Sequence, residues 1–389
     1  MIDTSKTIGT EETFEPKKIS GLLSQGIITN ITNLEKAIFC LEYVGQLQAE
    51  GLDLIFKGGS AAQILLGDRW THLSIDVDAC TGASDEELKT ILEKIHRKFD
   101  GKSFSYTPRD REISSGIPFY LYRIETPAIS ERSRTILLDV IGIKPKLAVQ
   151  QTPLKAFFFD SSASVTTPTI GALLGDKLST IGPTTIGRPL NDSRNGLEYA
   201  KHFFDIGSLQ QTNFELEHCK TAYAEARRVQ SMVRGKEYAP DECFNDMLFT
   251  CQVASLSQRV GEEAIKELKK LSPSKANRAT SELRILRDGL QRFRPFLVQK
   301  TSYSWDDLRY NAARTALLIK MLNSTITGTK ARKILNAEAP TTKKEILRLI
   351  EHIESIPKEK RWFIMPEEIE NFPKILKAWH NFFFFDELT

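Results

Sequence analysis

Residues 54–78 constrain the fold more than any other part of the chain. Leu54-Ile55-Phe56 is an apolar run typical of a buried strand, and the two glycines that follow Lys57 predict a turn in which φ can be positive. Residues 60–66 then predict a short helix, and residues 74–78 predict a second strand. A strand, a turn, a helix and another strand in so short a segment predict an α/β arrangement.

The second of these strands carries two carboxylates on one face. Side chains two residues apart in a strand point the same way, so Asp76 and Asp78 lie together while Val77 faces an apolar layer. Oxygen ligands at this spacing suit Mg²⁺, which takes one or two protein carboxylates and fills its shell with water and phosphate oxygens. The pattern predicts a metal site; the alternative is two solvated acids on an edge strand.

The glycine turn completes a candidate phosphate site. Backbone N–H groups at the start of the helix, together with the hydroxyl of Ser60, are expected to face a triphosphate. A Gly-Gly-Ser alone more often marks a plain turn, but its order with the two carboxylates favours metal-dependent handling of a nucleoside triphosphate. The residues to which we assign nucleotide binding here are Lys57, Gly58, Gly59, Ser60 and Ser74.

A third carboxylate interrupts a later apolar run. Residues 134–143 are nearly all apolar or β-branched after the first, as is typical of a central strand, and Asp139 is the one acid among them. A charge in such a strand is costly unless it is paired or bound to a metal. We therefore predict that Asp139 joins Asp76 and Asp78; the alternative is an aspartate that reaches the surface at the strand end.

The chain changes character near residue 210. Before it, helices alternate with strands, which are expected near 52–57, 74–79, 103–107, 117–125, 134–142 and 154–159. After it, helical patterns dominate, among them 213–232, 242–257, 276–297, 305–324 and 341–354. We predict an α/β (α+β) domain with a mixed sheet over 1–210, its core at about 30–210, and an all-α domain over 211–389 that binds RNA or a partner.

Two further motifs follow these elements in order. They are Gly175-Asp176-Lys177-Leu178 and Lys201-His202-Phe203-Phe204-Asp205-Ile206. With the Lys-Gly-Gly-Ser, Asp-Val-Asp and Leu-Asp-Val segments, the ordered set over about residues 30–210 resembles the AbiEii-type nucleotidyltransferases. These are the toxin halves of type IV toxin-antitoxin and abortive-infection systems, within the polymerase β-like nucleotidyltransferase superfamily.

The resemblance implies roles for particular residues. Asp76, Asp78 and Asp139 would hold the catalytic metals, Mg²⁺ or Mn²⁺, and Lys177 would lie near the triphosphate of an NTP substrate. Asp205 matches the second acid of the family's later motif, whereas His202 replaces the first acid. The resemblance also implies a cognate antitoxin as partner.

Lys177 and Asp205 have simpler interpretations beside these. Residues 169–181 are apolar at helical spacing, and Lys177 lies beside that stripe, where a lysine can extend its stem along apolar surface. Lys201 and Asp205 are four residues apart in a second helical pattern, which fits an intrahelical ion pair. If they are active-site groups, Lys177 neutralises phosphate charge and Asp205 orients it or the acceptor hydroxyl.

Ser74 lies two residues before Asp76, on the same predicted face. In relatives, a serine or threonine near this motif can be a site where a partner antitoxin adds phosphate. A phosphate there would compete for the metals and repel Asp76. The alternative is a plain strand serine.

The charge of the chain is uneven. The net charge is only +3, yet residues 257–300 hold eleven Lys and Arg against five acids. Such an excess can follow a nucleic-acid backbone, or it can form solvated helix faces with intrahelical pairs. The candidate RNA-binding residues are Lys275, Arg278, Arg284, Arg287, Arg292 and Arg294.

Composition favours a cytoplasmic enzyme. The 389 residues contain no apolar run of membrane-spanning length, and the polar N-terminus does not resemble a signal sequence. Five cysteines without a Cys-x-x-Cys pair argue against a disulfide framework or a zinc site.

Three classes of function remain. The leading one is transfer of a nucleotide from an NTP to an RNA end, most plausibly the 3′ end of tRNA, by a toxin or phage-defence effector. The second is nucleotidylylation of a protein or small molecule, and the third is a module that binds NTP or RNA without turnover. The complete carboxylate set argues against the third.

Overall fold

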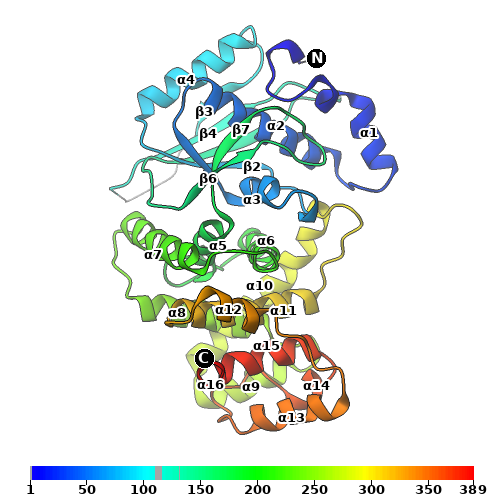
Figure 1. The fold of residues 1–389 in the computed structure, drawn as a ribbon, viewed down its shortest axis with the longest axis vertical. Helices are drawn as coiled ribbons and strands as arrows, with labels where there is room; N and C mark the ends of the chain where they lie inside the picture. The colour runs from blue at the N-terminus through cyan, green and yellow to red at the C-terminus, as the bar shows by residue number, and fades with distance from the viewer. Residues whose placement is uncertain (1, 110–115, 131) are drawn as a thin grey trace. The chain divides into compact units, whose positions relative to one another are not determined.

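The computed structural model describes residues 2–109, 116–130 and 132–389 (Figure 1). The chain forms two compact units. The sheet unit comprises Met1–Asp176, Thr221–Glu237 and Pro295–Ser302, and the helical unit comprises Lys177–Lys220, Tyr238–Arg294 and Tyr303–Thr389. These divisions differ from the predicted boundary at residue 210, because helices α5 and α7 each pass from one unit to the other within their length.

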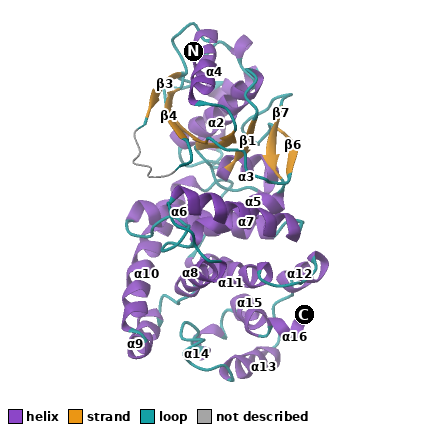
Figure 2. Ribbon diagram, turned by 90° about the vertical axis from the view of Figure 1, so that its left-hand side faces the viewer, coloured by secondary structure: helices purple, strands orange, loops and turns teal. Residues whose placement is uncertain are grey.

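The sheet unit contains the strands of the described chain (Figure 2). The strands are β1 (Leu54–Lys57), β2 (Asp76–Thr81), β3 (Ser105–Pro108), β4 (Phe119–Glu125), β5 (Thr135–Ile141), β6 (Val149–Pro153) and β7 (Ser164–Pro168). Five of them form a sheet in the order β1-β2-β5-β4-β3, in which β2 and β5 are parallel and the other neighbours antiparallel. The mixed sheet predicted from the sequence is confirmed.

One face of this sheet is the core of the unit. Val77, Leu138 and Val140 point to this face and are fully buried, with α2 (Ile31–Ala49) and α4 (Asp85–Lys98) packed in the same apolar cluster. Helix α4 begins with a capping box, in which Ser84 and Glu87 exchange hydrogen bonds. Because side chains alternate along a strand, the residues between these apolar ones lie on the opposite face.

The remaining helices of the sheet unit are short or shared. They are α1 (Pro16–Ser24), α3 (Gly58–Leu66), the first part of α5 (Ile170–Leu178) and the second part of α7 (Leu216–Val233). All five cysteines are buried free thiols. Within the described ranges, no helix is both long enough and apolar enough to cross a membrane.

The helical unit is built around α6, α8, α10 and α11. Its helices are α6 (Ser193–Gln210), α8 (Pro240–Ala254), α9 (Gly261–Leu271), α10 (Pro273–Phe293), α11 (Trp305–Leu322), α12 (Gly328–Leu335), α13 (Lys343–Glu354), α14 (Pro366–Ile369), α15 (Pro373–Phe383) and α16 (Phe385–Leu388). Helices α6 and α10 meet backbone to backbone, since a Cβ at Gly289 would lie 2.1 Å from the carbonyl oxygen of Gly196. Glycine at both positions permits this approach.

One predicted strand is wrong. Residues 154–159 join β6 to β7 and form only an isolated bridge between Ala156 and Phe159. The apolar character that suggested a strand comes from burial of this connection, where Phe158 and Phe159 are almost fully buried. The strands β6 and β7 that it joins are largely polar and were not anticipated.

Candidate active site

The three predicted carboxylates share one face of the sheet. Asp78 on β2 lies opposite Asp139 on the parallel strand β5, and Asp76 precedes Asp78 by two residues on the same face. Each side chain is partly exposed, whereas Val77 and Leu138 between them are buried in the core. The apolar alternation of two parallel strands therefore fixes the direction of all three acids. We call this group the carboxylate face.

Gly58 brings the backbone turn against Asp78. Its φ is +76°, as the Gly-Gly sequence predicted, and an ideal Cβ there would lie 2.1 Å from Oδ2 of Asp78. Register explains the closeness, because Lys57 at the end of β1 is the partner of Asp78 in the antiparallel pair. Two features therefore require glycine at this position: the positive φ and the lack of space for a Cβ beside Asp78.

Ser60 holds the start of β2. Its hydroxyl donates a hydrogen bond of 2.7 Å to the main-chain carbonyl of Asp76, and the residue is fully buried. The sequence prediction had this hydroxyl facing a phosphate; the structure instead places it on a backbone partner, so Ser60 positions the strand that carries Asp76. A neighbouring contact runs from the N–H of Ser74 to Oε1 of Gln63, at 3.3 Å.

Ser74 does not lie on the strand. Strand β2 begins at Asp76, so the prediction that Ser74 shares its face by alternation is wrong. The side chain is partly exposed in the segment that leads into the strand. The residues just before it pair with a distant segment: His72 forms an isolated antiparallel bridge with Leu297, and the N–H of Leu73 donates to the carbonyl of Phe296 at 2.8 Å.

Lys57 is bound to an acid that the sequence analysis did not select. Its ammonium group donates to both carboxylate oxygens of Asp176 on α5, each at 3.0 Å, and both side chains are largely buried. Burial opposes the charge on Lys57, but Asp176 outweighs it and raises the pKa of this lysine above its ordinary value. Asp176 stands directly before Lys177 in the Gly-Asp-Lys-Leu motif, and this position was the sequence signal that could have identified it.

Asp139 is also bound to an unforeseen partner. The guanidinium group of Arg109 forms an ion pair with the carboxylate of Asp139. The main-chain N–H of Arg109 donates to the main-chain carbonyl of Leu121 on β4 at 2.8 Å. Leu121 is the register partner of Asp139, so the pairing of β4 with β5 delivers Arg109 to the acid. No local pattern in the sequence marks this contact, because it depends on the order of the strands.

The fit of a metal ion can be judged from these contacts. Across the residues that the structure describes, no three His, Cys, Asp or Glu side chains are grouped closely enough to hold one. Asp76 and Asp78 alone match the chemistry of Mg²⁺, which commonly takes one or two carboxylates and completes its shell with substrate phosphates and water. The carboxylate of Asp139 is already paired through Oδ1 with the guanidinium group of Arg109.

Lys177 and Asp205 meet inside the helical unit. The ammonium group of Lys177 donates to the carboxylate of Asp205 on α6, and their side chains are only 8% and 2% exposed. Lys201, the other candidate partner of Asp205, forms an ion pair with Glu198 at 3.2 Å. The structure thus brings together the two residues that the later motifs had suggested separately.

His202 stands beside this pair as a neutral group. Burial, reinforced by the charge of Lys177, lowers the pKa of His202 to about 3. Its Nδ1 is buried and has no hydrogen-bond partner among the residues that the structure describes. A histidine here cannot supply the negative charge of the acid that it replaces.

Comparison with known proteins identifies the chain. The family model described as nucleotidyl transferase AbiEii toxin, type IV toxin-antitoxin system, matches residues 44–309. The chain belongs to the AbiEii family. No curated protein matches it. Membership makes this protein a nucleotidyltransferase of the toxin type, as the motifs had implied.

Two solved structures are similar to this AbiEii-family chain. The nucleotidyltransferase toxin MenT4 from Mycobacterium tuberculosis is 11% identical, with 78% of this chain and 99% of its own covered and a TM-score of 0.39. JHP933 from Helicobacter pylori is 15% identical, with 67% and 92% covered and a TM-score of 0.30. Both scores are low, so neither structure informs the geometry of this site.

The basic segment of this AbiEii-family chain is only partly a charged surface. Arg278 on α10 donates to Asp246 and Glu282, each at 2.6 Å, and it lies over the ring of Phe249. It belongs to an internal ion-pair network rather than to a surface. Arg287 is partly buried against Ser257. The exposed members are Lys275, Arg284, Arg292 and Arg294.

Proposed function

We propose that this protein transfers a nucleotide from an NTP to an RNA acceptor, most plausibly the 3′ end of tRNA, and thereby blocks translation. The observation that carries the proposal is the carboxylate face, where Asp78 lies opposite Asp139 and against Gly58. Two same-face acids beside a glycine turn suit a metal-bound triphosphate. The AbiEii family supplies the reaction class and an antitoxin as the expected partner.

Each residue has a part in the proposed transfer. Asp76 and Asp78 would hold Mg²⁺ or Mn²⁺, and such an ion supplies activation of the attacking hydroxyl and stabilisation of the leaving pyrophosphate. Gly58 and Gly59 let the backbone N–H groups of the turn approach phosphate oxygens. Once the ion pair with Arg109 opens, the carboxylate of Asp139 accepts the proton of the attacking hydroxyl.

The helical unit is proposed to contribute in two ways. Lys177, with Asp205 fixing its ammonium group, would neutralise charge on the transferring phosphate. The exposed cations of α10 and Arg294 after it would follow the RNA backbone, so binding should weaken as salt rises. Arg278 is left out of this surface because its charge is already matched by two acids.

The test is a transfer assay with purified protein, Mg²⁺, total tRNA and each labelled NTP in turn. Asp76→Ala removes one carboxylate of the carboxylate face. The matched control is Asp68→Ala, which removes an exposed aspartate after α3. We expect label to enter tRNA from one or two nucleotides with the wild type and with Asp68→Ala, and not with Asp76→Ala.

Other outcomes would redirect the proposal. Label in a protein or small molecule of an added lysate, with none in RNA, would keep the transferase and change the acceptor. Label in nothing, from a protein that still binds NTP, would contradict catalysis and favour a binding module. Equal labelling by Asp76→Ala would remove the carboxylate face from the mechanism.

A further inference from the structure

Arg314 is a buried cation that forms no ion pair with an acid among the residues that the structure describes. It lies on α11, is 3% exposed, and donates from Nη2 to the main-chain carbonyl of Gln210 at 3.2 Å and to Oδ1 of Asn336 at 3.3 Å. Its Nε is buried and has no hydrogen-bond partner in that part of the chain, and its Cζ lies 5.6 Å from the ring centroid of Tyr310. Burial lowers the pKa of Arg314, and the side chain of Tyr310 opposes this shift. Uncompensated charge in an interior is costly.

Arg309 on the same helix is a useful comparison. It is equally buried, at 3% exposed, yet it forms ion pairs with Asp306 and Glu368 and donates to the carbonyl of Ser255. Two buried arginines on one helix are therefore handled differently. Among the described residues, Arg309 has two acidic partners, whereas Arg314 meets only a carbonyl, an amide oxygen and the ring of Tyr310.

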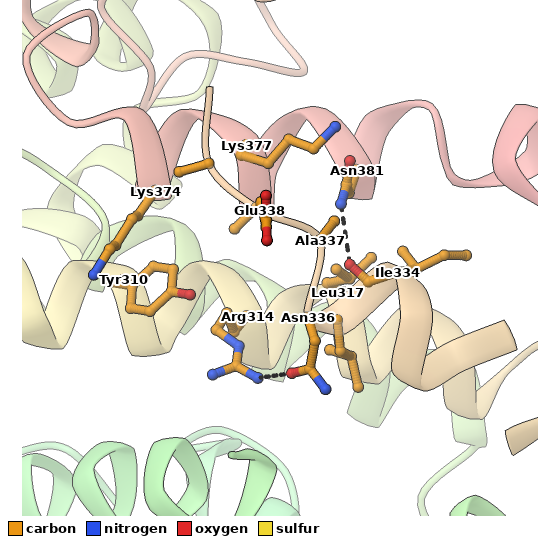
Figure 3. A pocket seen from close by; sticks show the side chains of 13 residues that line it. Tyr310, Arg314, Leu317, Ile334, Asn336, Ala337, Glu338, Lys374, Lys377 and Asn381 are labelled. Atoms are coloured by element: carbon orange, nitrogen blue, oxygen red, sulfur yellow. Dashed lines mark hydrogen bonds between the residues drawn. The ribbon is translucent and has the colours of Figure 1, made fainter. Parts of the chain in front are cut away.

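A cavity of about 250 Å³ opens beside Arg314, between α11, α12 and α15 (Figure 3). Lys374 and Lys377 from α15 line it, and burial lowers the pKa of Lys377. Glu338 is the acid that lines it, and this side chain is exposed. Three cations against one carboxylate leave the cavity with an excess of positive charge.

Asn381 adds a second buried polar atom to the lining of the cavity. It is 3% exposed, and its Nδ2 donates to the carbonyl of Ile334 at 3.1 Å, as Figure 3 shows. Among the described residues, its buried Oδ1 accepts no hydrogen bond of standard geometry, although the side chain of the neighbouring His380 interacts with Asn381. This oxygen needs a donor such as a hydroxyl group. The wall beyond it is apolar, formed in part by Leu317 and Ala378.

The charge, the size and the polar groups of this cavity indicate the kind of ligand that would fit it. A planar guanidinium binds phosphate oxygens through parallel N–H groups, and buried cations gain most from an anion. The volume is small for a ligand site, which favours a compact molecule. We propose that this cavity, the Arg314 pocket, binds a small phosphorylated molecule that carries hydroxyl groups, such as a sugar phosphate. The site is separate from the proposed nucleotide transfer and does not depend on it.

Calorimetry on the full chain tests the proposal, with ribose 5-phosphate as the probe and EDTA present to suppress metal-dependent binding elsewhere. Arg314→Gln removes the buried charge, and Arg348→Gln is the control because Arg348 is exposed on α13. We expect binding by the wild type and by Arg348→Gln, and at least about tenfold weaker binding by Arg314→Gln. Equal affinity for all three, or no binding by the wild type, would overturn the pocket.

Two milder variants keep the test decisive if Arg314→Gln fails to fold. Lys377→Gln at the edge of the pocket should weaken binding several-fold, whereas Glu338→Gln should strengthen it by removing repulsion. No change in either variant would overturn the proposal. Inorganic phosphate and ribose serve as further probes: phosphate should bind more weakly than ribose 5-phosphate, and ribose should not bind. Equal affinity for phosphate and ribose 5-phosphate would overturn the role of Asn381.

Discussion

The carboxylate face of the sheet unit and the Arg314 pocket of the helical unit gather charge of opposite sign. In the first, Asp76, Asp78 and Asp139 lie on one side of two paired strands. In the second, Arg314 and two lysines line one cavity. Each region is partly offset by a neighbour of the other sign, Arg109 beside Asp139 and Glu338 at the cavity. An excess of one sign of charge still favours a ligand of the opposite sign. The comparison predicts a cation for one region and an anion for the other.

The Lys177–Asp205 pair is the contrasting case, since both signs are present there. The cation and the acid are more buried than the members of the carboxylate face, and each is the other's partner. Such a pair can be structural, catalytic or both. Four predictions test which of these charged groups bind a ligand and which only stabilise the fold.

Asp78→Asn should have the largest effect. It keeps the shape of the side chain and removes the charge that would hold the metal, so we expect nucleotide transfer to fall by about 10³-fold or more. Initial rates of label transfer measure the loss, and chelation of divalent ions should reproduce it in the wild type. Asp68→Asn, at an exposed position, serves as control. A variant with near-normal rates would show that the carboxylate face does not need its charge.

Lys177→Met should destabilise the helical unit. It leaves Asp205 buried without its cation, which typically costs about 3 to 5 kcal/mol. Urea denaturation measures the free energy of unfolding. The double variant Lys177→Met with Asp205→Leu should recover most of this loss, because no lone charge remains. Recovery of stability with transfer still absent would assign chemistry to the pair, whereas recovery of both would make it structural.

Gly58→Ala should slow transfer by about 100-fold, because the added Cβ pushes Asp78 out of place. Gly51→Ala is a matched control, since Gly51 also has a positive φ, +90°, but no atom lies within 4 Å of its ideal Cβ. Both variants place an alanine at a positive φ, but only Gly58→Ala puts its Cβ against Asp78. Equal losses in the two would attribute the effect to strain alone.

His202 should give the smallest effect, seen in the pH dependence of stability. Its pKa is about 3 in the folded protein and near 6.5 when unfolded, so the unfolded chain binds the extra proton first. Stability from this group is complete above pH 6.5 and declines as the pH falls toward 3, by up to about 1.4 kcal/mol per pH unit. His202→Gln should flatten this decline in thermal melts from pH 7 to pH 4. An unchanged slope would refute the assignment.

Local pattern predicted much of the fold and part of the site. The i, i+2 spacing of Asp76 and Asp78 and the glycine turn with positive φ depend on neighbouring residues, and both are present. The strand expected over 154–159 failed because an apolar segment can be buried as a connection as well as in a sheet.

The sequence by itself determined which residues lie on which face of a strand or helix, because those periods are set by the backbone. Only the tertiary structure decided which charges are paired. Arg109 reaches Asp139 through strand order, and Lys57 reaches Asp176 across 119 residues. Within the described part of the chain, Arg309 pairs with two acids and Arg314 with none. Ion pairs between distant segments depend on how the helices and strands pack, and a local sequence pattern does not encode that packing.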